Sequence, residues 1–262
     1  MPFKVVILND TSISGHFGGK LVMNALYREL GLRDVEVLQR VQVREPWEGY
    51  KKIMDKADLI IVNGEGSIHH GSRMELLEVA EYYPSALINA VYQEVPSNKW
   101  VKDFKYIAVR ESLSQEKVAE HGGIATVVPD LLFTHNIPRP EITEDLCLVD
   151  SCVSRGTGLK PTEANFIRKM GSAAKVCTGR FHGACLAMLW GMPFSAYPSN
   201  THKTKGMLMD AGCNLYFDTQ EEALDNIGEF DATTYISNAR KAISDMFNQV
   251  VECGKAPTGA IS

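Results

Sequence analysis

The stretch 174–206 reads AKVCTGRFHGACLAMLWGMPFSAYPSNTHKTKG, and it decides the fold that the sequence predicts. Ala174–Cys177 is a short apolar run typical of a buried strand, and Phe194–Tyr197 is another. An apolar helix, Ala184–Trp190, lies between them and ends at Gly-Met-Pro, and a further helix is expected over Met207–Ala211. This alternation predicts a βαβα run built on a parallel sheet.

Both strand-to-helix turns of this stretch carry cationic or titratable side chains. Arg180 and His182 follow the first strand, and Lys203 and Lys205 follow the second. Such turns lie at the carboxyl edge of a parallel sheet, where free helix N–H groups and the helix dipole favour an anion. One histidine or lysine in a turn is more often a solvated surface residue. Four of them on adjacent turns favour a site for an anionic donor.

The rest of the chain alternates strands and helices in the same way. Short apolar runs predict strands at 4–8, 35–38, 58–62, 85–92, 106–110, 125–128, 146–149 and 215–217. Amphipathic patterns predict helices at 21–30, 47–54, 114–120, 161–170, 221–227 and 235–251.

A linker is expected at 136–145, which contains two prolines and several acids without periodicity. The predicted fold class is therefore α/β, with two Rossmann-like domains facing a cleft in a GT-B-like arrangement. The first domain spans 1–138 on the acceptor side and the second spans 139–230 on the donor side. A C-terminal helix and tail, 231–262, are expected to pack back on the first domain.

Two polar turns of the first domain are candidate sites. Asp10 and His16 follow the first predicted strand, and Gly18 and Gly19 begin the next helix. This is the general layout of a phosphate or nucleotide turn, although the G-x-G-x-x-G pattern is absent. The alternative is that the two glycines let the helix pack close to the sheet.

The second candidate turn, 63–71, reads NGEGSIHHG and follows the strand 58–62. It brings Glu65, Ser67 and His69 to the carboxyl end of that strand. Glu65 could simply cap the next helix. We favour a general acid/base site, because glutamate and histidine are common proton-transfer groups and the turn shares a sheet edge with Asp10 and His16.

The composition sets limits on the class of protein. The 262 residues are 45% hydrophobic and 23% charged, as expected for a globular protein with a core, and the net charge of −5 creates no global basic field for nucleic acid. No apolar run approaches the roughly 18–20 residues of a membrane span. The sequence begins directly with a strand pattern, so we expect a cytoplasmic protein (in the host cytoplasm if the source is a virus). Six scattered cysteines predict reduced thiols and no zinc site.

Five short motifs, in this order along the chain, resemble those of polysaccharide pyruvyl transferases. The turn Asn63–Ser67 occupies the place of that family's glycine-rich turn. The run Tyr106–Ser114, then Gly122-Gly123 and Val128-Pro129-Asp130, is similar to V-R-[DE]-x-x-S … G … v-x-D. The remaining matches are Gly179–Gly183 with R-x-H-G, Gly191–Pro193 with G-[IVM]-P, and Lys203–Gly206 with K-x-x-G. The resemblance covers roughly residues 1–212.

The resemblance implies a GT-B-like fold with the donor between the domains, and no metal or cofactor in the chemistry. It implies that phosphoenolpyruvate is the donor and that the product is a pyruvyl ketal on a sugar. Arg180 would bind the donor's phosphate or carboxylate, His182 would act as general acid or donor ligand, and Lys203 would add charge. Glu65 stands where the family usually has glycine, so a carboxylate there could be a catalytic base that the relatives lack.

The sequence thus predicts a metal-independent transferase that moves a glycosyl or pyruvyl group from a nucleotide sugar or phosphoenolpyruvate to a saccharide-type hydroxyl. One alternative is a nucleotide-sugar-dependent glycosyltransferase that acts on modified, viral DNA bases. The net charge counts against it, although Lys99, Lys102 and Lys105, or Lys203 and Lys205, could form a local basic patch. Another alternative is a non-catalytic sugar- or nucleotide-binding module. The oligomeric state stays open.

The candidate residues fall into two groups. The catalytic candidates are His182, Glu65, Asp10, His16 and His69. The donor-binding candidates are Arg180, Gly183, Ser199, Asn200, Lys203, Lys205, Gly18, Gly19, Ser67 and Arg110.

Overall fold

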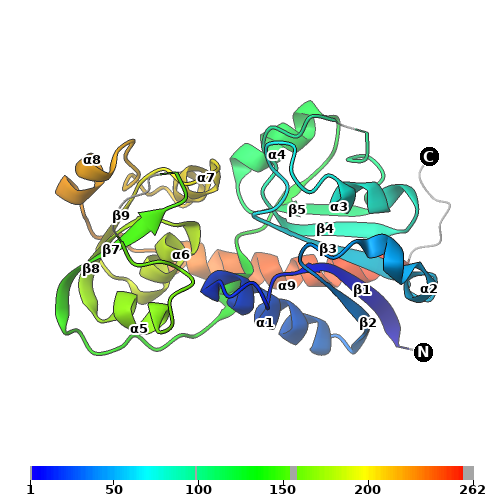
Figure 1. Ribbon diagram of the computed structural model, residues 1–262, viewed down its shortest axis with the longest axis horizontal. Coiled ribbons are helices and arrows are strands. Elements are labelled where there is room, and N and C mark those ends of the chain that lie inside the picture. Colours follow the sequence, from blue (N-terminus) through cyan, green and yellow to red (C-terminus); the bar gives the residue numbers. More distant parts are fainter. Residues whose placement is uncertain (1, 98, 154–157, 256–262) are drawn as a thin grey trace.

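Two parallel sheets lying side by side form the frame of the protein (Figure 1), in a computed structural model that describes residues 2–97, 99–153 and 158–255. The first sheet has the order β2-β1-β3-β4-β5-β6, and its strands are β1 (Phe3–Asp10), β2 (Val35–Gln42), β3 (Leu59–Glu65), β4 (Ser85–Ala90), β5 (Tyr106–Val109) and β6 (Thr126–Val127). The second has the order β7-β8-β9, with β7 (Glu144–Ser151), β8 (Ala173–Gly179) and β9 (Phe194–Ala196). The α/β prediction is confirmed.

Helices connect the strands on both sides of the sheets. Those of the first part are α1 (Phe17–Gly31), α2 (Lys51–Met54) after the 3-10 turn η1 (Trp47–Tyr50), α3 (Glu75–Glu78) with η2 (Val79–Glu81), α4 (Ser112–Glu120) and η3 (Leu131–Thr134). Those that follow are α5 (Phe166–Gly171), α6 (Phe181–Trp190), α7 (Lys203–Asp210), α8 (Gln220–Asp225) and α9 (Thr233–Lys255).

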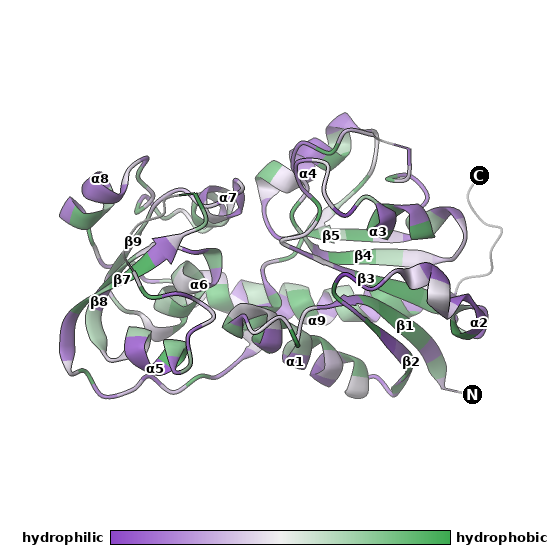
Figure 2. Cartoon of the chain, viewed as in Figure 1, coloured by the Kyte–Doolittle hydropathy of each residue, from purple (hydrophilic) through white to green (hydrophobic). Residues whose placement is uncertain are grey.

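The central strands of the first sheet are hydrophobic on both faces, as parallel strands covered by helices must be (Figure 2). Val5 and Ile7 of β1 face a core that includes α1 and α9, whereas Val6 and Leu8 face a core that includes Trp47. The C-terminal helix α9 packs against β5 and α1. Its predicted packing on the first sheet is confirmed.

One hydrophobic cluster runs through both sheets. It joins Val5 and Ile61 of the first sheet to Val149 and Val176 of the second, and it includes much of α6 and α9. The two predicted domains therefore share a core, and the proposed boundaries at 138 and 230 stay a prediction.

The order of the first sheet reverses at β1, since β2 lies on one side of β1 and β3 on the other. Ligands of open α/β sheets bind at such a switch point, outside the carboxyl ends of the two strands. Asp10 ends β1 and Glu65 ends β3. The topology thus marks the turns that follow these two residues as the edge where a ligand is expected.

Several elements differ from the expected boundaries. Helix α6 begins at Phe181 and α7 at Lys203, so Arg180 is the N-cap residue of α6 and Lys203 lies in the first turn of α7. Helix α5 begins only at Phe166, because Asn165 before it has a left-handed φ of 67°. The expected strand 215–217 contributes only a bridge between Tyr216 and Ala196.

Candidate functional site

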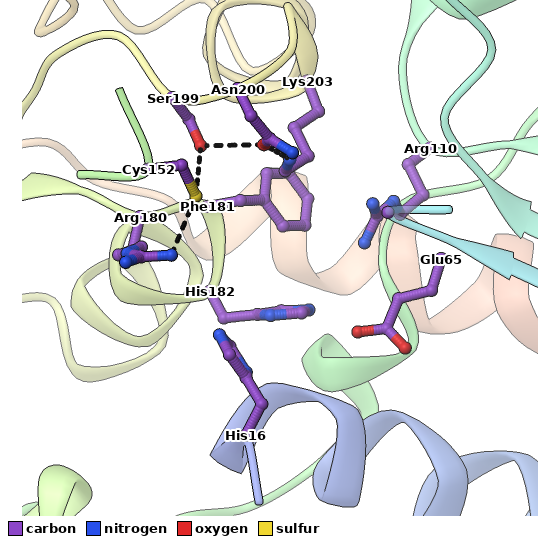
Figure 3. A pocket seen from close by; sticks show the side chains of 11 residues that line it. His16, Glu65, Arg110, Cys152, Arg180, Phe181, His182, Ser199, Asn200 and Lys203 are labelled. Atoms are coloured by element: carbon purple, nitrogen blue, oxygen red, sulfur yellow. Dashed lines mark hydrogen bonds between the residues drawn. The ribbon is translucent and has the colours of Figure 1, made fainter. Parts of the chain in front are cut away.

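A cavity of about 240 Å³ lies between the carboxyl edges of the two sheets (Figure 3). The first sheet and its connections contribute His16, Glu65, Gly66 and Arg110. The second sheet contributes Cys152, Arg180, Phe181, His182, Ser199, Asn200 and Lys203. The cavity thus brings together eight of the candidate residues from turns that are far apart in the sequence.

Arg180 is the N-cap residue of α6, and a carboxylate of the neighbouring strand holds its side chain. Its Nε and a terminal nitrogen each donate to Asp150 at 2.7 Å. The other terminal nitrogen donates to the sulfur of Cys152 at 2.8 Å. This two-point pairing fixes the plane of the guanidinium and balances its charge within the protein.

His182 lies in the first turn of α6 and is 6% exposed. Its Nε2 is 3.4 Å from Oδ2 of Asp130, which also accepts a hydrogen bond from Arg110 at 2.8 Å. Burial alone would raise the pKa of Asp130, but His182 and Arg110 hold it well below its usual value. Asp130 is therefore an ionised, fully buried carboxylate that orients His182.

Lys203 is the first residue of α7, and unlike Arg180 it has no carboxylate partner among the described residues. Its Nζ donates to the neutral oxygens of Asn200 at 2.6 Å and Thr201 at 3.0 Å. No carboxylate of the described residues comes within ion-pair distance. Burial, reinforced by the charge of Arg110, lowers the pKa of Lys203 to about 7. An anion in the cavity would reverse this effect and stabilise the ammonium form.

His16 faces His182 across the cavity, with ring centroids 5.9 Å apart. Its Nδ1 accepts the backbone N–H of Gly18 at 3.2 Å and so caps α1. Burial and the neighbouring charges of His182, Arg180 and Lys203 lower its pKa to about 3. The ring is neutral at physiological pH, and its Nε2 carries the proton because Nδ1 acts as acceptor.

Glu65 supplies the carboxylate of the first-sheet wall and points toward the ring of His182 (Figure 3). Its Oε2 is buried and has no hydrogen-bond partner in the described part of the chain. The residue also has a φ of 32°, in the left-handed region that side chains other than glycine rarely adopt. Strained backbone of this kind gathers at functional sites.

Three polar candidates of the first sheet lie outside the cavity because other groups bind them. The carboxylate of Asp10 accepts from Tyr27 and from the backbone of Ser12. The hydroxyl of Ser67 accepts from Asn9 at 3.1 Å. His69 lies at the rim, where its Nε2 contacts the carbonyl of Gly66 at 3.0 Å.

The glycine candidates serve packing. A Cβ on Gly18 would lie 2.0 Å from the ring of His182, so glycine lets α1 approach that ring. A Cβ on Gly19 would lie 3.0 Å from the carbonyl of Thr11, and one on Gly183 would lie 2.4 Å from the hydroxyl of Thr178. The close-packing alternative for Gly18 and Gly19 agrees with these distances.

Lys205, the last of the donor-binding candidates, points away from the cavity. It is exposed, and its Nζ lies 6.0 Å from the ring centre of Tyr216. Lys205 comes two residues after Lys203 in α7, so its side chain is rotated by about 200° around the helix axis relative to that of Lys203.

Several residues at the cavity or paired with its side chains were not predicted from the sequence. Asp130 and Asp150 pair with cationic side chains, and Cys152, Phe181 and Gly66 line the cavity. Asp130 closes the motif Val128-Pro129-Asp130, which could have marked it. Asp150 ends an apolar strand pattern opposite the strand that leads to Arg180, and only the pairing of β7 with β8 reveals that contact.

Within residues 2–97, 99–153 and 158–255, no three His, Cys, Asp or Glu side chains cluster in a way that could hold a metal ion. The helices of the same ranges include none that is both long and apolar enough to cross a bilayer.

Comparisons with known proteins show a likeness of fold to a solved structure. No protein-family model matches the chain, and no curated protein does. Among solved structures, a functionally uncharacterised protein, KP1_0663 from Klebsiella pneumoniae subsp. pneumoniae NTUH-K2044, has a TM-score of 0.60 at 14% identity and covers 83% of this chain and 93% of its own. An alpha-glucosyltransferase, solved with UDP and a 13-mer DNA containing an HMU base, has a TM-score of 0.46 at 8% identity over 97% of this chain and 95% of its own.

Proposed function

We propose that this chain is a metal-independent group transferase, which moves a pyruvyl or glycosyl group from an anionic donor to a hydroxyl of a saccharide-type acceptor. The cavity between the two sheets is the proposed active site. The observation that carries this proposal is the state of Lys203, a buried ammonium group with only neutral hydrogen-bond partners among the described residues. Such a group favours a ligand that brings the missing negative charge.

The second-sheet wall suits the leaving group of the reaction. When the donor's bond to its phosphate breaks, negative charge develops on the phosphate oxygens. Lys203 and the N–H groups of the first turn of α6 would stabilise that charge. His182, oriented by Asp130, lies beside them and would donate a proton to the leaving oxygen or a hydrogen bond to the donor.

The first-sheet wall suits the acceptor. Glu65 has a free carboxylate oxygen that points into the cavity. With a nucleotide sugar, it would take the proton of the acceptor hydroxyl as that oxygen bonds to the anomeric carbon and the leaving phosphate retains the electrons of the broken bond. With phosphoenolpyruvate, one acceptor hydroxyl would add to C2 and lose its proton to Glu65 while C3 gains one proton. Phosphate would then leave with the electrons of its bond to C2, and a second acceptor hydroxyl would add there and give its proton to the phosphate, which closes the ketal. Holding both substrates between two walls would supply much of the rate, because their relative position is fixed in advance.

The size of the cavity favours a compact donor. Its volume of about 240 Å³ lies below the range of roughly 300–1,000 Å³ of pockets for drug-sized ligands. Its one phenyl ring, that of Phe181, is covered by the guanidinium of Arg110 at 4.5 Å and offers little surface for stacking a base. Both features support phosphoenolpyruvate over a nucleotide sugar as the donor.

A calorimetric titration against phosphoenolpyruvate and a panel of UDP-, GDP-, CMP- and dTDP-sugars tests the donor. We expect heat of binding with phosphoenolpyruvate, and a melting temperature that rises with its concentration because the ligand binds the folded state. A response to one nucleotide sugar alone would make the protein a glycosyltransferase. Binding of none of these donors at millimolar concentration would refute the proposal.

Glu65→Gln separates an enzyme from a binding module. With the identified donor and a panel of glycans, we expect turnover to fall by about 10²–10⁴-fold while the donor's Kd stays within about twofold, because the carboxylate acts on the acceptor. Glu48→Gln, at an exposed position in η1, is the matched control. Equal turnover in the wild type and Glu65→Gln would remove Glu65 from the mechanism.

The alternative of a DNA acceptor was linked to two possible basic patches, and the first of these lies away from the cavity. Lys99, Lys102 and Lys105 precede β5 and so lie near the amino edge of the first sheet, opposite the cavity. Lys99 is also paired with Glu81 at 2.6 Å. A saccharide acceptor is therefore the proposal that we retain.

A further inference from the structure

A second buried carboxylate, Glu111, lies close to the cavity without lining it. It follows Arg110 in the sequence, caps the start of α4 and has no exposed surface. Its Oε2 accepts the backbone N–H of Ser114 at 3.0 Å, and its other oxygen accepts the Ser114 hydroxyl. Because a buried carboxylate is costly to desolvate, its remaining contacts need an explanation.

Those remaining contacts come from His202, the N-cap residue of α7, and from Gly206 in its first turn. Nε2 of His202 lies 3.3 Å from Glu111 and 3.1 Å from the Ser114 hydroxyl. One turn later, Gly206 packs so close that a Cβ there would lie 2.4 Å from Oε2 of Glu111. Residues 202 and 206 share a face of the helix, since they are four positions apart.

Lys203 lies between these two contacts. It follows His202 directly, and its side chain runs into the cavity beside Asn200. The backbone N–H of His202 is also held by Gln93 at 2.8 Å, and Ser112 of α4 binds Asp210 at the other end of α7. Residues that follow strands of the first sheet thus bind α7 at both ends. They also contact it at His202 and Gly206, on either side of Lys203, whose ammonium group has no carboxylate partner among the described residues.

We infer that Glu111 is a positioning residue: by contacting the N-cap residue His202 and the first-turn residue Gly206 of α7, it fixes where Lys203 presents its ammonium group to the anionic ligand. The inference rests on the proposed function, in which Lys203 meets the donor's phosphate. The inference adds that residues of the first sheet determine how strongly Lys203, a residue of the second sheet, binds the donor.

A double-mutant cycle with inorganic sulfate as the probe tests this inference. We expect Glu111→Gln to weaken sulfate binding about tenfold in the wild-type background and to have no further effect in a Lys203→Met background, because the two residues act as one unit. Glu116→Gln, an exposed position of the same helix, is the matched control. Equal weakening in both backgrounds, or none in the wild type, would overturn the inference.

A second variant covers the case in which Glu111→Gln fails to fold. Gly206→Ala disturbs the same contact from the side of α7, and we expect a similar loss of sulfate affinity that again depends on Lys203. An affinity within twofold of the wild type in this variant would contradict the inference.

A third measurement needs no ligand. Acetylation of Lys203, followed by mass spectrometry over a pH series, reports the titration of its amine directly. If Glu111→Gln lets Lys203 reach water, the midpoint of this profile rises by about one pH unit or more. An unchanged midpoint would count against the positioning role. A shifted midpoint in a protein that binds no donor would sustain the positioning role and refute only the proposed function.

Discussion

The two strand-to-helix turns of the second sheet place a cation in the same cavity, but they balance its charge differently. The turn after β8 carries Arg180, which Asp150 holds through two hydrogen bonds of 2.7 Å. The turn after β9 leads to Lys203, which has only the oxygens of Asn200 and Thr201. A cation that is already paired shapes the wall of the cavity. A buried cation without a carboxylate leaves charge for a ligand to balance.

Of the substitutions that test this contrast, Lys203→Met is expected to have the largest effect on sulfate binding. Loss of the ammonium group should weaken sulfate binding about a hundredfold, since a charge-assisted hydrogen bond contributes about 1.5–3 kcal/mol. The melting temperature of the free protein should not fall, because burial of the ammonium opposes folding. Calorimetry and thermal unfolding measure the two effects, and unchanged sulfate affinity would refute the role given to Lys203.

The second-largest expected effect is that of pH on the affinity for sulfate. With a pKa of about 7 in the free protein, Lys203 must take up a proton to bind an anion at higher pH. Sulfate keeps its charge over this range, so its affinity should be constant below pH 7 and fall about tenfold per pH unit above it. Calorimetry between pH 6 and 9 should show this slope in the wild type and not in Lys203→Met. A flat wild-type profile would mean that Lys203 stays protonated throughout.

Asp150→Asn should make the two turns alike, because each would then carry a cation without a carboxylate partner. Removing the carboxylate leaves Arg180 without its counter-charge, so we expect sulfate to bind about fivefold tighter and the free energy of unfolding to fall by about 1–3 kcal/mol. Asp145→Asn, on the same strand but exposed, is the control. Weaker binding in Asp150→Asn would show that Asp150 is needed to orient Arg180 toward the ligand.

The smallest effect is expected for Lys205→Met. This substitution removes the same charge two residues from Lys203, from a side chain that lies over Tyr216. Sulfate affinity should change by less than about twofold, because exposed charges outside the cavity are screened by salt. A loss comparable to that of Lys203→Met would mean that net charge and not placement decides binding.

The sequence predicted the frame of the protein and the edge at which the cavity forms, because apolar strand patterns and the turns between them are local signals. It also predicted Arg180, His182 and Lys203 together, since the turns that carry them follow adjacent parallel strands. The direction of a side chain was harder to predict. Lys205 was expected beside Lys203, but the helix begins four residues earlier than its apolar pattern suggested, and this sets the two lysines on different faces.

Contacts between distant segments could not be predicted at all. Asp10 looked like a free carboxylate at a strand end, yet Tyr27 of α1 binds it. Asp130 meets His182 and Arg110 only because the two sheets share a core. These pairs depend on how α1, α6 and the strands are placed in space, and a single sequence carries no local signal for that placement.

The position of α9 has a consequence for the order in which the protein can fold during synthesis. Phe3 in β1 lies so close to Gly254 in α9 that a Cβ on the glycine would be 2.4 Å from its ring. Ile243 and Phe247 of α9 belong to the same core as Val5 and Ile7. Because the second sheet lies between β1 and α9 in the sequence, it is synthesised before α9 completes the cover that α1 begins over one face of the first sheet.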